Sequence, residues 1–193
     1  MRVVAGVAGG RRLRAPEGRR IRPTSERVRE AVFNALGSME EIAGRSVLDL
    51  FAGTGALGIE ALSRGAATAT FVDADQGAVR AIEANLAATG LGERARVVHD
   101  DVQRFLGRPG AGQFDLAFAD PPYAFSDWAA LLDRVPARLI AIEARSHVDV
   151  GDGWRALRSR RYGDTVVTLA RRPAGEPPVQ TVGGEPPVQA EGG

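Results

Sequence analysis

The segment Asp120-Pro121-Pro122-Tyr123 places a carboxylate, two rigid residues and an aromatic ring in four consecutive positions. An exocyclic amine on a nucleic-acid base is a poor nucleophile, because its lone pair is delocalised into the ring. Asp120 can accept one hydrogen of such an amine, and the Pro121 carbonyl can accept another. The prolines restrict the loop, and Tyr123 offers a flat face on which a base can stack. These four residues form the predicted catalytic segment for chemistry at an amino nitrogen.

A glycine-rich segment with the sequence DLFAGTGALG extends from Asp49 to Gly58. Its glycines, Gly53, Gly55 and Gly58, have the G-x-G-x-x-G spacing that is found in dinucleotide-binding turns. A pyrophosphate at this turn would lie close to the negative charge of Asp49. The ammonium group of S-adenosylmethionine (SAM) suits that carboxylate better, directly or through water. We therefore expect SAM rather than NAD, with a turn that only packs a helix on a strand as the alternative.

Further carboxylates follow the next two predicted strands. Asp73 lies about 20 residues after Gly53, where it can accept hydrogen bonds from ribose hydroxyls. Asp75 is expected to cap the following helix. Asp101 is expected to accept from the adenine amino group, with a helix N-cap as the alternative. The predicted cofactor-binding residues are Thr24, Asp49, Phe51, Gly53, Thr54, Gly55, Asp73, Ala74, Asp101, Val102 and Asp120.

These motifs must be positioned by alternating strands and helices. The predicted strands cover residues 46–51, 68–72, 96–98, 114–119 and 139–143, and the predicted helices cover 24–36, 56–63, 76–88, 102–106 and 128–135. Gly37 is expected to end the first helix. Such alternation predicts an α/β fold with a parallel sheet covered on both faces. Residues 154–162 and 165–170 are expected to form a closing hairpin, and residues 2–14 an N-terminal hairpin that turns at Gly9-Gly10.

The composition fits one soluble globular domain of 193 residues, with 44% hydrophobic and 25% charged residues. There is no cysteine, which excludes disulfides and a thiolate nucleophile. The two histidines form no helical pair, so no metal is expected. No apolar run approaches the ~20 residues that span a bilayer, and the N-terminus lacks a secretory signal. We therefore expect a cytoplasmic protein without a membrane partner.

Positive charge is concentrated at the N-terminus. All 25 basic residues are arginine. Residues 1–29 hold nine arginines and two glutamates, a local charge of +7, so the rest of the chain carries −6 of the net +1. A basic arm on an acidic body indicates a polyanionic partner, with a solvated arginine-rich strand pair as the alternative.

The C-terminal segment differs from the rest of the chain in composition. The hexapeptide GEPPVQ occurs at 175–180 and again at 184–189. A Pro/Gly-rich tail with little apolar content cannot offset its ordering entropy. We predict that residues 174–193 are disordered and not catalytic. The expected organisation is a basic hairpin at 1–22, a Rossmann-like domain at 23–172 and a tail at 173–193.

Three segments are distinctive: GGRRL at 9–13, RPTSERVREAVFN at 22–34 and DLFAGTGALGIEALSR at 49–64. Together they resemble the RsmD family of class I SAM-dependent methyltransferases. The match runs in order from Arg2 to about Ala170, and the RPT sequence at 22–24 is not shared by methyltransferases at large. The all-arginine basic set and the tail depart from the family pattern.

The resemblance implies a seven-stranded, mostly parallel Rossmann-like sheet with an N-terminal β-hairpin extension. It implies SAM as the donor, S-adenosyl-L-homocysteine as the product, and N2 of a guanine in small-subunit (16S) ribosomal RNA as the acceptor. The substrate would be the small ribosomal subunit or its assembly intermediate, and the protein a monomer. Phosphate contacts, which carry little sequence information, would come from Arg11, Arg12, Arg14, Arg19, Arg20 and Arg22. Specificity would come from a loop base that is flipped against Tyr123.

Other functions remain as alternatives. The Asp-Pro-Pro-Tyr segment indicates an amino group without naming the base, so an adenine-N6 methyltransferase acting on DNA or RNA is the first alternative. A DNA enzyme normally needs an added target-recognition segment, which residues 123–139 are too few to hold. A non-catalytic RNA-binding Rossmann protein is the second alternative, disfavoured by the intact Asp120 and Tyr123. The choice of guanine rests on the family resemblance.

Overall fold

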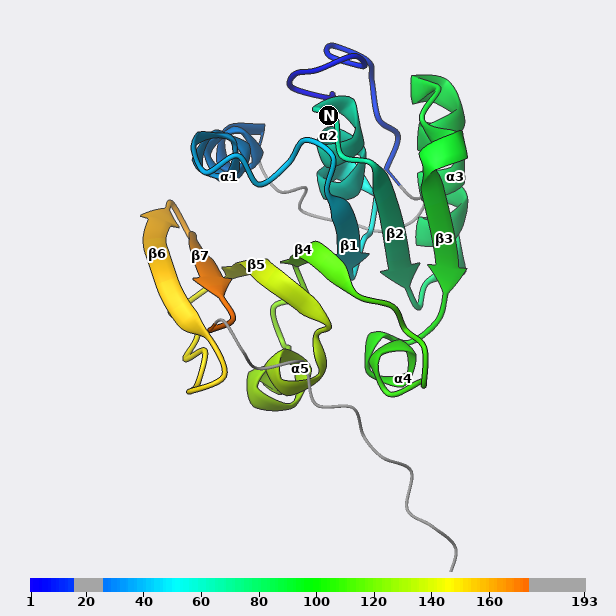
Figure 1. The fold of residues 1–193 in the computed structure, drawn as a ribbon. Helices are drawn as coiled ribbons and strands as arrows, with labels where there is room; N and C mark the ends of the chain where they lie inside the picture. Colours follow the sequence, from blue (N-terminus) through cyan, green and yellow to red (C-terminus); the bar gives the residue numbers. More distant parts are fainter. Residues whose placement is uncertain (16–25, 174–193) are drawn as a thin grey trace, which may run out of the picture.

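The strands form one sheet of seven, in the order β3-β2-β1-β4-β5-β7-β6 (Figure 1). The first five in this order run parallel, and β7 is antiparallel to both β5 and β6. The computed structural model describes residues 1–15 and 26–173. Its elements are α1 (Glu26–Ser38), β1 (Ser46–Leu50), α2 (Ala56–Ser63), β2 (Thr68–Asp73), α3 (Gln76–Thr89), η1 (Gly92–Arg94), β3 (Ala95–His99), α4 (Val102–Leu106), β4 (Phe114–Ala119), α5 (Trp128–Arg134), β5 (Ala137–Ala144), β6 (Arg155–Tyr162) and β7 (Thr165–Arg171).

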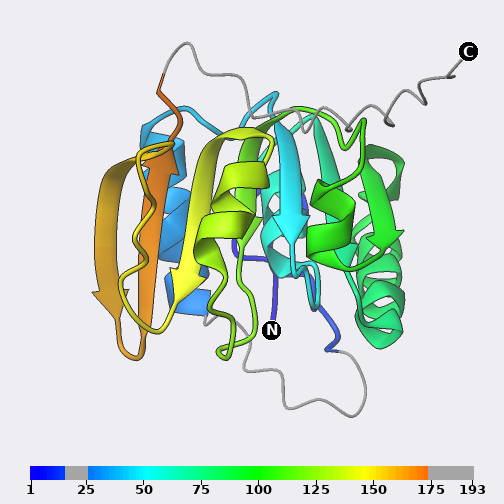
Figure 2. The ribbon, with the colours of Figure 1, turned by 90° about the horizontal axis from the view of Figure 1, so that it is seen from below.

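Helices cover both faces of the sheet. α1, α2 and α3 lie on one face, and α4 and α5 lie on the other, as Figures 1 and 2 show from two directions. Each face has its own apolar cluster, one around Phe33, Ile59 and Ile82 and the other around Phe105 and Leu131. Central strands are therefore buried on both sides, as parallel strands require. The predicted fold class, a class I SAM-dependent methyltransferase fold, is confirmed.

Each predicted strand and helix is present with ends within two residues of the prediction, and α2, α4 and β4 match residue for residue. The expectation that Gly37 ends the first helix is wrong, because α1 continues to Ser38. Gly37 does not adopt the left-handed conformation that a C-terminal glycine cap uses. Glu40 adopts it instead, with φ 56°, and the N–H groups of Met39 and Glu41 both donate to the Leu36 carbonyl.

The N-terminal segment packs on α2 and α3. Arg2 and Arg12 form an isolated antiparallel bridge, flanked by hydrogen bonds from Val3 N to Arg11 O and from Leu13 N to Met1 O. The turn is wider than the predicted Gly9-Gly10 turn and spans residues 5–10. Val3 and Leu13 are buried, which holds the segment against the core.

No helix within residues 1–15 and 26–173 is long and apolar enough to cross a membrane.

Candidate active site

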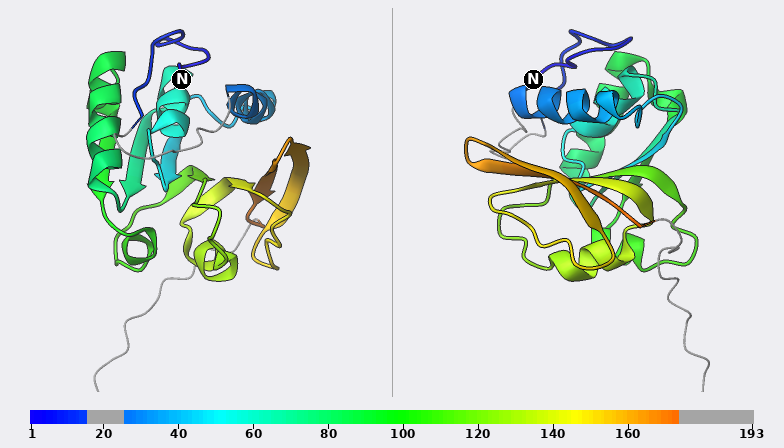
Figure 3. Two further views of the ribbon diagram at one scale, coloured as in Figure 1. Left: turned by 180° about the vertical axis from the view of Figure 1, so that it is seen from behind. Right: turned by 60° about the vertical axis from the view of Figure 1, so that its left-hand side comes forward.

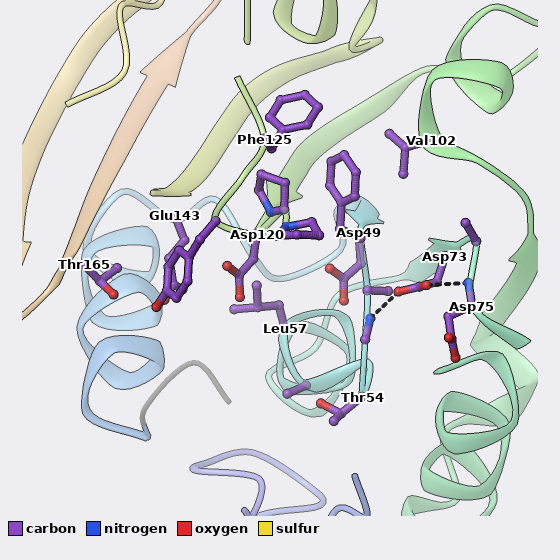
Figure 4. Close-up of a pocket in the computed structure, with 18 of the residues that line it drawn as sticks. Asp49, Thr54, Leu57, Asp73, Asp75, Val102, Asp120, Phe125, Glu143 and Thr165 are labelled. Carbon is purple, nitrogen blue, oxygen red and sulfur yellow. Dashed lines mark hydrogen bonds between the residues drawn. The ribbon is translucent and has the colours of Figure 1, made fainter. Parts of the chain in front are cut away.

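A cavity lies beside β1, where the strand order of the sheet reverses its direction. β2 and β3 lie on one side of β1, whereas β4 and β5 lie on the other. Leu50 at the end of β1 pairs with Ala119 at the end of β4, so the glycine-rich turn and the Asp-Pro-Pro-Tyr loop leave the sheet side by side. Open α/β sheets bind ligands in this crevice. The cavity has a volume of about 910 Å³. Figure 4 shows residues that line it.

The cavity brings the two predicted groups of residues together. All four residues of the predicted catalytic segment, Asp120 to Tyr123, line it. Gly55 is not part of the lining; it precedes α2 with φ 74°. Thr24 lies outside the described residues. The predicted cofactor-binding residues that line the cavity are Asp49, Phe51, Gly53, Thr54, Asp73, Ala74, Asp101, Val102 and Asp120.

The turn after β1 has an unusual backbone. Gly53 and Gly55 have positive φ, and so does Phe51, with φ 56°. A side chain larger than that of Asn or Asp in this conformation costs about 1–3 kcal/mol. The Phe51 ring packs edge-on against Phe125, with centroids 5.4 Å apart. This aromatic contact links the glycine turn to the loop after β4 and helps to hold the strained residue.

Asp49 is a buried carboxylate at the wall of the cavity. Only 1% of the residue is exposed, and its Oδ2 accepts from Gly58 N–H at 2.8 Å. Burial raises its pKa well above the usual range, the Gly58 N–H opposes this shift, and the charges of Asp120 and Asp73 add to it. A cation bound beside Asp49 would favour its charged form. Gly58 is required here, because an added methyl group would clash with the Phe71 ring.

Asp73 organises the backbone around the turn. Its Oδ2 accepts from Gly53 N–H and its Oδ1 from Asp75 N–H, each at 2.8 Å (dashed lines in Figure 4). Each carboxylate oxygen has a second lone pair, which leaves acceptor capacity for a ribose. The prediction that Asp75 is an N-cap is confirmed, since its side chain accepts from Ala78 N–H at 2.9 Å.

Asp101 is an N-cap, and its predicted contact with the adenine amino group stays a prediction. It caps α4 by accepting from Arg104 N–H at 3.0 Å, and it also lines the cavity. Gln103 lines the cavity beside it. Both polar atoms of its amide are buried, and neither has a hydrogen-bond partner in the described part of the chain. A ligand that offers a donor and an acceptor, as an adenine edge does, would complete this site.

The Asp-Pro-Pro-Tyr loop closes on itself through one hydrogen bond, from Phe125 N–H to the Pro122 carbonyl at 2.8 Å. No hydrogen bond to the Pro121 carbonyl is found within residues 1–15 and 26–173. The acceptor role of the Pro121 carbonyl stays a prediction. Tyr123 is 44% exposed, and it lines the cavity.

Sequence reasoning missed three residues of the cavity. Glu143, Tyr162 and Thr165 line it, and Figure 4 shows Glu143 and Thr165 on the side of Asp120 that faces away from Asp73. Glu143 lies near the end of β5, which pairs with β4. The rule that ligands bind at the carboxyl ends of parallel strands could have identified Glu143. Tyr162 and Thr165 come from the antiparallel hairpin, for which that rule gives no signal.

Three of the predicted RNA-binding arginines lie within the described residues. Arg11, Arg12 and Arg14 are exposed and do not line the cavity. The Arg11 guanidinium donates to the Ala88 carbonyl at 2.7 Å, and the backbone N–H and carbonyl of Arg14 are held by Asn85. The other three, Arg19, Arg20 and Arg22, lie outside the described residues.

The strand order, the glycine turn and the acidic residues at the carboxyl ends of β1, β2 and β4 define a class I SAM-dependent methyltransferase fold. Residues 1–171 match the family described as conserved hypothetical protein 95. The chain belongs to this family, the RsmD family of methyltransferases.

Relatives and solved structures agree with this assignment. YlbH of Bacillus subtilis, a candidate rRNA methyltransferase, is 42% identical over 134 residues, which are 68% of this chain and 72% of that protein. Ribosomal RNA small subunit methyltransferase D of Escherichia coli is 42% identical over 123 residues, 64% of this chain and 60% of that protein. The structure of yhhF from Escherichia coli, a candidate methyltransferase, has a TM-score of 0.78 at 34% identity and covers 89% of this chain and 97% of its own.

Proposed function

We propose that this chain transfers a methyl group from SAM to the exocyclic N2 amino group of a guanine in small-subunit (16S) ribosomal RNA. One observation carries the proposal: the Asp-Pro-Pro-Tyr loop and the glycine-rich turn line the same cavity. This shared lining supports an acceptor site for an amino group next to a site for the donor. The relative named ribosomal RNA small subunit methyltransferase D supports ribosomal RNA as the substrate.

The residues of the cavity fit SAM. Asp49 would stabilise its positively charged end, Asp73 its ribose, and Asp101 with Gln103 its adenine. When bound, SAM supplies a methyl group on a sulfonium that is ready for transfer to a nucleophile. Among the described residues, no cluster of three or more His, Asp or Glu side chains could hold a metal ion. The proposed chemistry requires none.

Asp120 and the Pro121 carbonyl would accept hydrogens from the substrate amine. Accepting these hydrogens helps to localise the nitrogen lone pair and to aim it at the donor side of the cavity. No covalent intermediate with the protein is needed, so the rate gain comes from positioning and charge placement. The two prolines keep the loop ordered before the base arrives, which lowers the entropic cost of binding.

The substrate side of the cavity favours guanine over adenine. Glu143 is a second carboxylate on that side, in addition to Asp120. Guanine presents two kinds of donor, N1–H and the N2 amino group, on one edge, whereas adenine presents an acceptor next to its amino group. An ionised carboxylate accepts hydrogen bonds and cannot donate them. Two carboxylates therefore suit the guanine edge, with Tyr123 stacking on the flipped base.

The cellular setting belongs to the same proposal. The N-terminal arginines would contact RNA phosphates, and the substrate would be the small ribosomal subunit or an assembly intermediate in the cytoplasm. We propose that the protein acts as a monomer, because one chain supplies both the donor side and the acceptor side of the cavity.

The decisive experiment transfers labelled methyl from SAM to small subunits that lack the modification. Wild-type protein should yield N2-methylguanosine after digestion of the RNA. Asp120→Ala should abolish transfer and leave SAM binding largely intact, whereas Asp133→Ala on the surface of α5 should change neither. N6-methyladenosine as the product would overturn the guanine assignment. Full activity of Asp120→Ala would refute the catalytic role of this residue.

A further inference from the structure

A second group of arginines lies far from the N-terminal segment in the sequence. β6 carries Arg155, Arg158, Arg160 and Arg161, here called the β6 arginines, and all four are exposed. β6 contains no acidic residue. Within the part of the chain that the structure describes, none of the four forms an ion pair, whereas Arg171 on neighbouring β7 pairs with Glu41 at 2.8 Å. The β6 arginines thus concentrate positive charge on a chain that carries −6 outside residues 1–29.

The strand that carries them ends at the cavity. β6 is an edge strand of the sheet, and its last residue, Tyr162, lines the cavity. The Arg160 guanidinium lies over the Tyr162 ring, 5.5 Å from its centroid. From Arg155 to Arg161, β6 extends for about 20 Å at ~3.3 Å per residue. The β6 arginines therefore extend from the wall of the cavity along the edge of the sheet. Figure 3 shows β6 at this edge.

Two contacts connect the β6 arginines to the proposed catalytic loop. The Arg161 guanidinium donates to the Arg145 carbonyl at 3.3 Å. The Arg145 guanidinium in turn lies 4.1 Å from the centroid of the Tyr123 ring. Tyr123 lines the cavity and Arg145 does not. Arg145 covers one face of the ring, which leaves the other face for a base.

Charge on an edge strand also has a simpler use, since it opposes pairing with other sheets. That use is met by either sign of charge and needs no contact with the cavity. The single sign of the β6 arginines, together with the Arg161–Arg145–Tyr123 contacts, is instead what a polyanion beside the target base requires.

We propose that the β6 arginines and Arg145 form a second RNA-binding surface, which holds phosphates next to the flipped guanosine. This inference rests on the proposed function. The surface lies on the substrate side of the cavity, so it would fix the strand that carries the target base. Such contacts give affinity and register but little sequence preference. Arg145 would pack on one face of the Tyr123 ring while the base stacks on the other face.

The test compares a β6 variant, Arg158→Gln/Arg160→Gln/Arg161→Gln, with the wild type in two assays. One assay measures binding of a naked 16S rRNA transcript as a function of salt, and the other measures methyl transfer to small subunits lacking the modification. The variant should raise KM for the subunits about tenfold or more and leave kcat at saturating substrate within about twofold. The slope of log affinity against log salt should become shallower by roughly 0.7 for each phosphate that the variant no longer neutralises.

A matched control removes the same charge elsewhere. Arg80→Gln/Arg96→Gln/Arg134→Gln changes three exposed arginines that do not line the cavity. Arg96 lies on β3, the opposite edge strand of the sheet. This control should keep the wild-type KM and a salt slope close to that of the wild type. SAM affinity should be unchanged in both variants, which verifies that each is folded.

Charge reversal separates phosphate binding from protection of the sheet edge. Arg158→Glu/Arg160→Glu/Arg161→Glu should bind RNA more weakly than the Gln variant, although glutamate protects an edge equally well. Wild-type KM and salt slope in the Gln variant would overturn the inference. It would also be overturned by weaker binding that is seen with subunits and not with naked RNA, since the partner would then be a ribosomal protein. If the wild type itself fails to methylate guanine, the proposed function fails instead.

Discussion

Asp49 shows how a single buried group can couple cofactor binding to stability. Burial raises its pKa, and the neighbouring charges of Asp120 and Asp73 act in the same direction. Below about pH 4, an aspartate is largely neutral in both the folded and the unfolded chain. As pH rises from about 4 toward the raised pKa, Asp49 ionises readily in the unfolded chain, whereas its burial opposes ionisation in the folded chain. Asp49 therefore costs stability at neutral pH.

We predict that Asp49→Asn raises Tm at neutral pH and weakens SAM binding. Asparagine can still accept from Gly58 N–H, but it carries no charge to bury and none to offer a cation. The gain in Tm should grow from about pH 4 upward. Thermal melts between pH 4 and 8 and SAM titrations measure both effects. Identical melting profiles and SAM affinities for the variant and the wild type would contradict this prediction.

Asp115 provides a control, because its pKa is shifted in the opposite direction to that of Asp49. Burial acts to raise its pKa, but hydrogen bonds from Ser46 and the charges of Arg45 and Arg138 outweigh it and lower the pKa. Its contribution to stability is present above the ordinary aspartate pKa and is lost as pH falls through the lowered one. Asp115→Asn should therefore lower Tm at neutral pH and have no effect in strong acid.

Residue types allowed much of the cavity to be predicted, because chemistry and spacing are local. Asp49, Asp73 and Asp120 all line it as expected. Asp101 shows where such reasoning stops. A carboxylate that follows a strand and precedes a helix satisfies both the pattern of an N-cap and that of a ligand acceptor, and the structure places this one where it can be both.

At the scale of elements, one buried carboxylate joins three segments. Glu60 on α2 is fully buried and accepts from Val4 N–H at 2.7 Å and Ala5 N–H at 3.0 Å. It also lies 3.7 Å from Arg29 on α1, whose side chain is equally buried. Arg29 in turn donates to the Arg2 carbonyl. Burial lowers the pKa of Arg29, and the nearby Glu60 opposes this shift. This network ties the N-terminal segment and α1 to α2.

We predict that Glu60→Gln lowers the free energy of unfolding by about 3–5 kcal/mol, because it leaves the Arg29 charge buried without its partner. Urea denaturation measures the decrease. Hydrogen exchange should show reduced protection at the amides of Val4 and Ala5. Glu26→Gln removes an exposed pair with Arg2 and should cost less than about 1 kcal/mol. Equal stabilities of the two variants would show that the network does not hold the segment.

Element boundaries were predictable where they depend on local signals and less so where they depend on pairing. α2 and α4 are flanked by turn residues and match the prediction. β5 begins at Ala137 rather than Leu139, because Ala137 pairs with Phe114 on β4. The same non-local pairing brings Tyr162 and Thr165 to the cavity. No local pattern around the closing hairpin indicates that its turn lies beside β5.

At the scale of the whole molecule, positive charge lies on two separate surfaces. The N-terminal segment packs over α2 and α3, whereas β6 forms the far edge of the sheet, and α1 lies between them in Figures 1 and 3. An RNA that reaches the cavity would contact both surfaces at once. Contacts to distant sites that share no partner contribute nearly additive free energies.

We predict that the two surfaces act additively on one bound RNA. Arg12→Gln/Arg14→Gln should weaken binding of a 16S rRNA transcript and make its salt dependence shallower. When these two substitutions are combined with the β6 variant, the losses of binding free energy that the two sets cause separately should add within about 0.5 kcal/mol. Filter binding at several salt concentrations measures both quantities. If the combined variant binds no more weakly than the poorer of its two parents, the surfaces do not hold the same RNA simultaneously. The path of the RNA would then follow one edge of the molecule only.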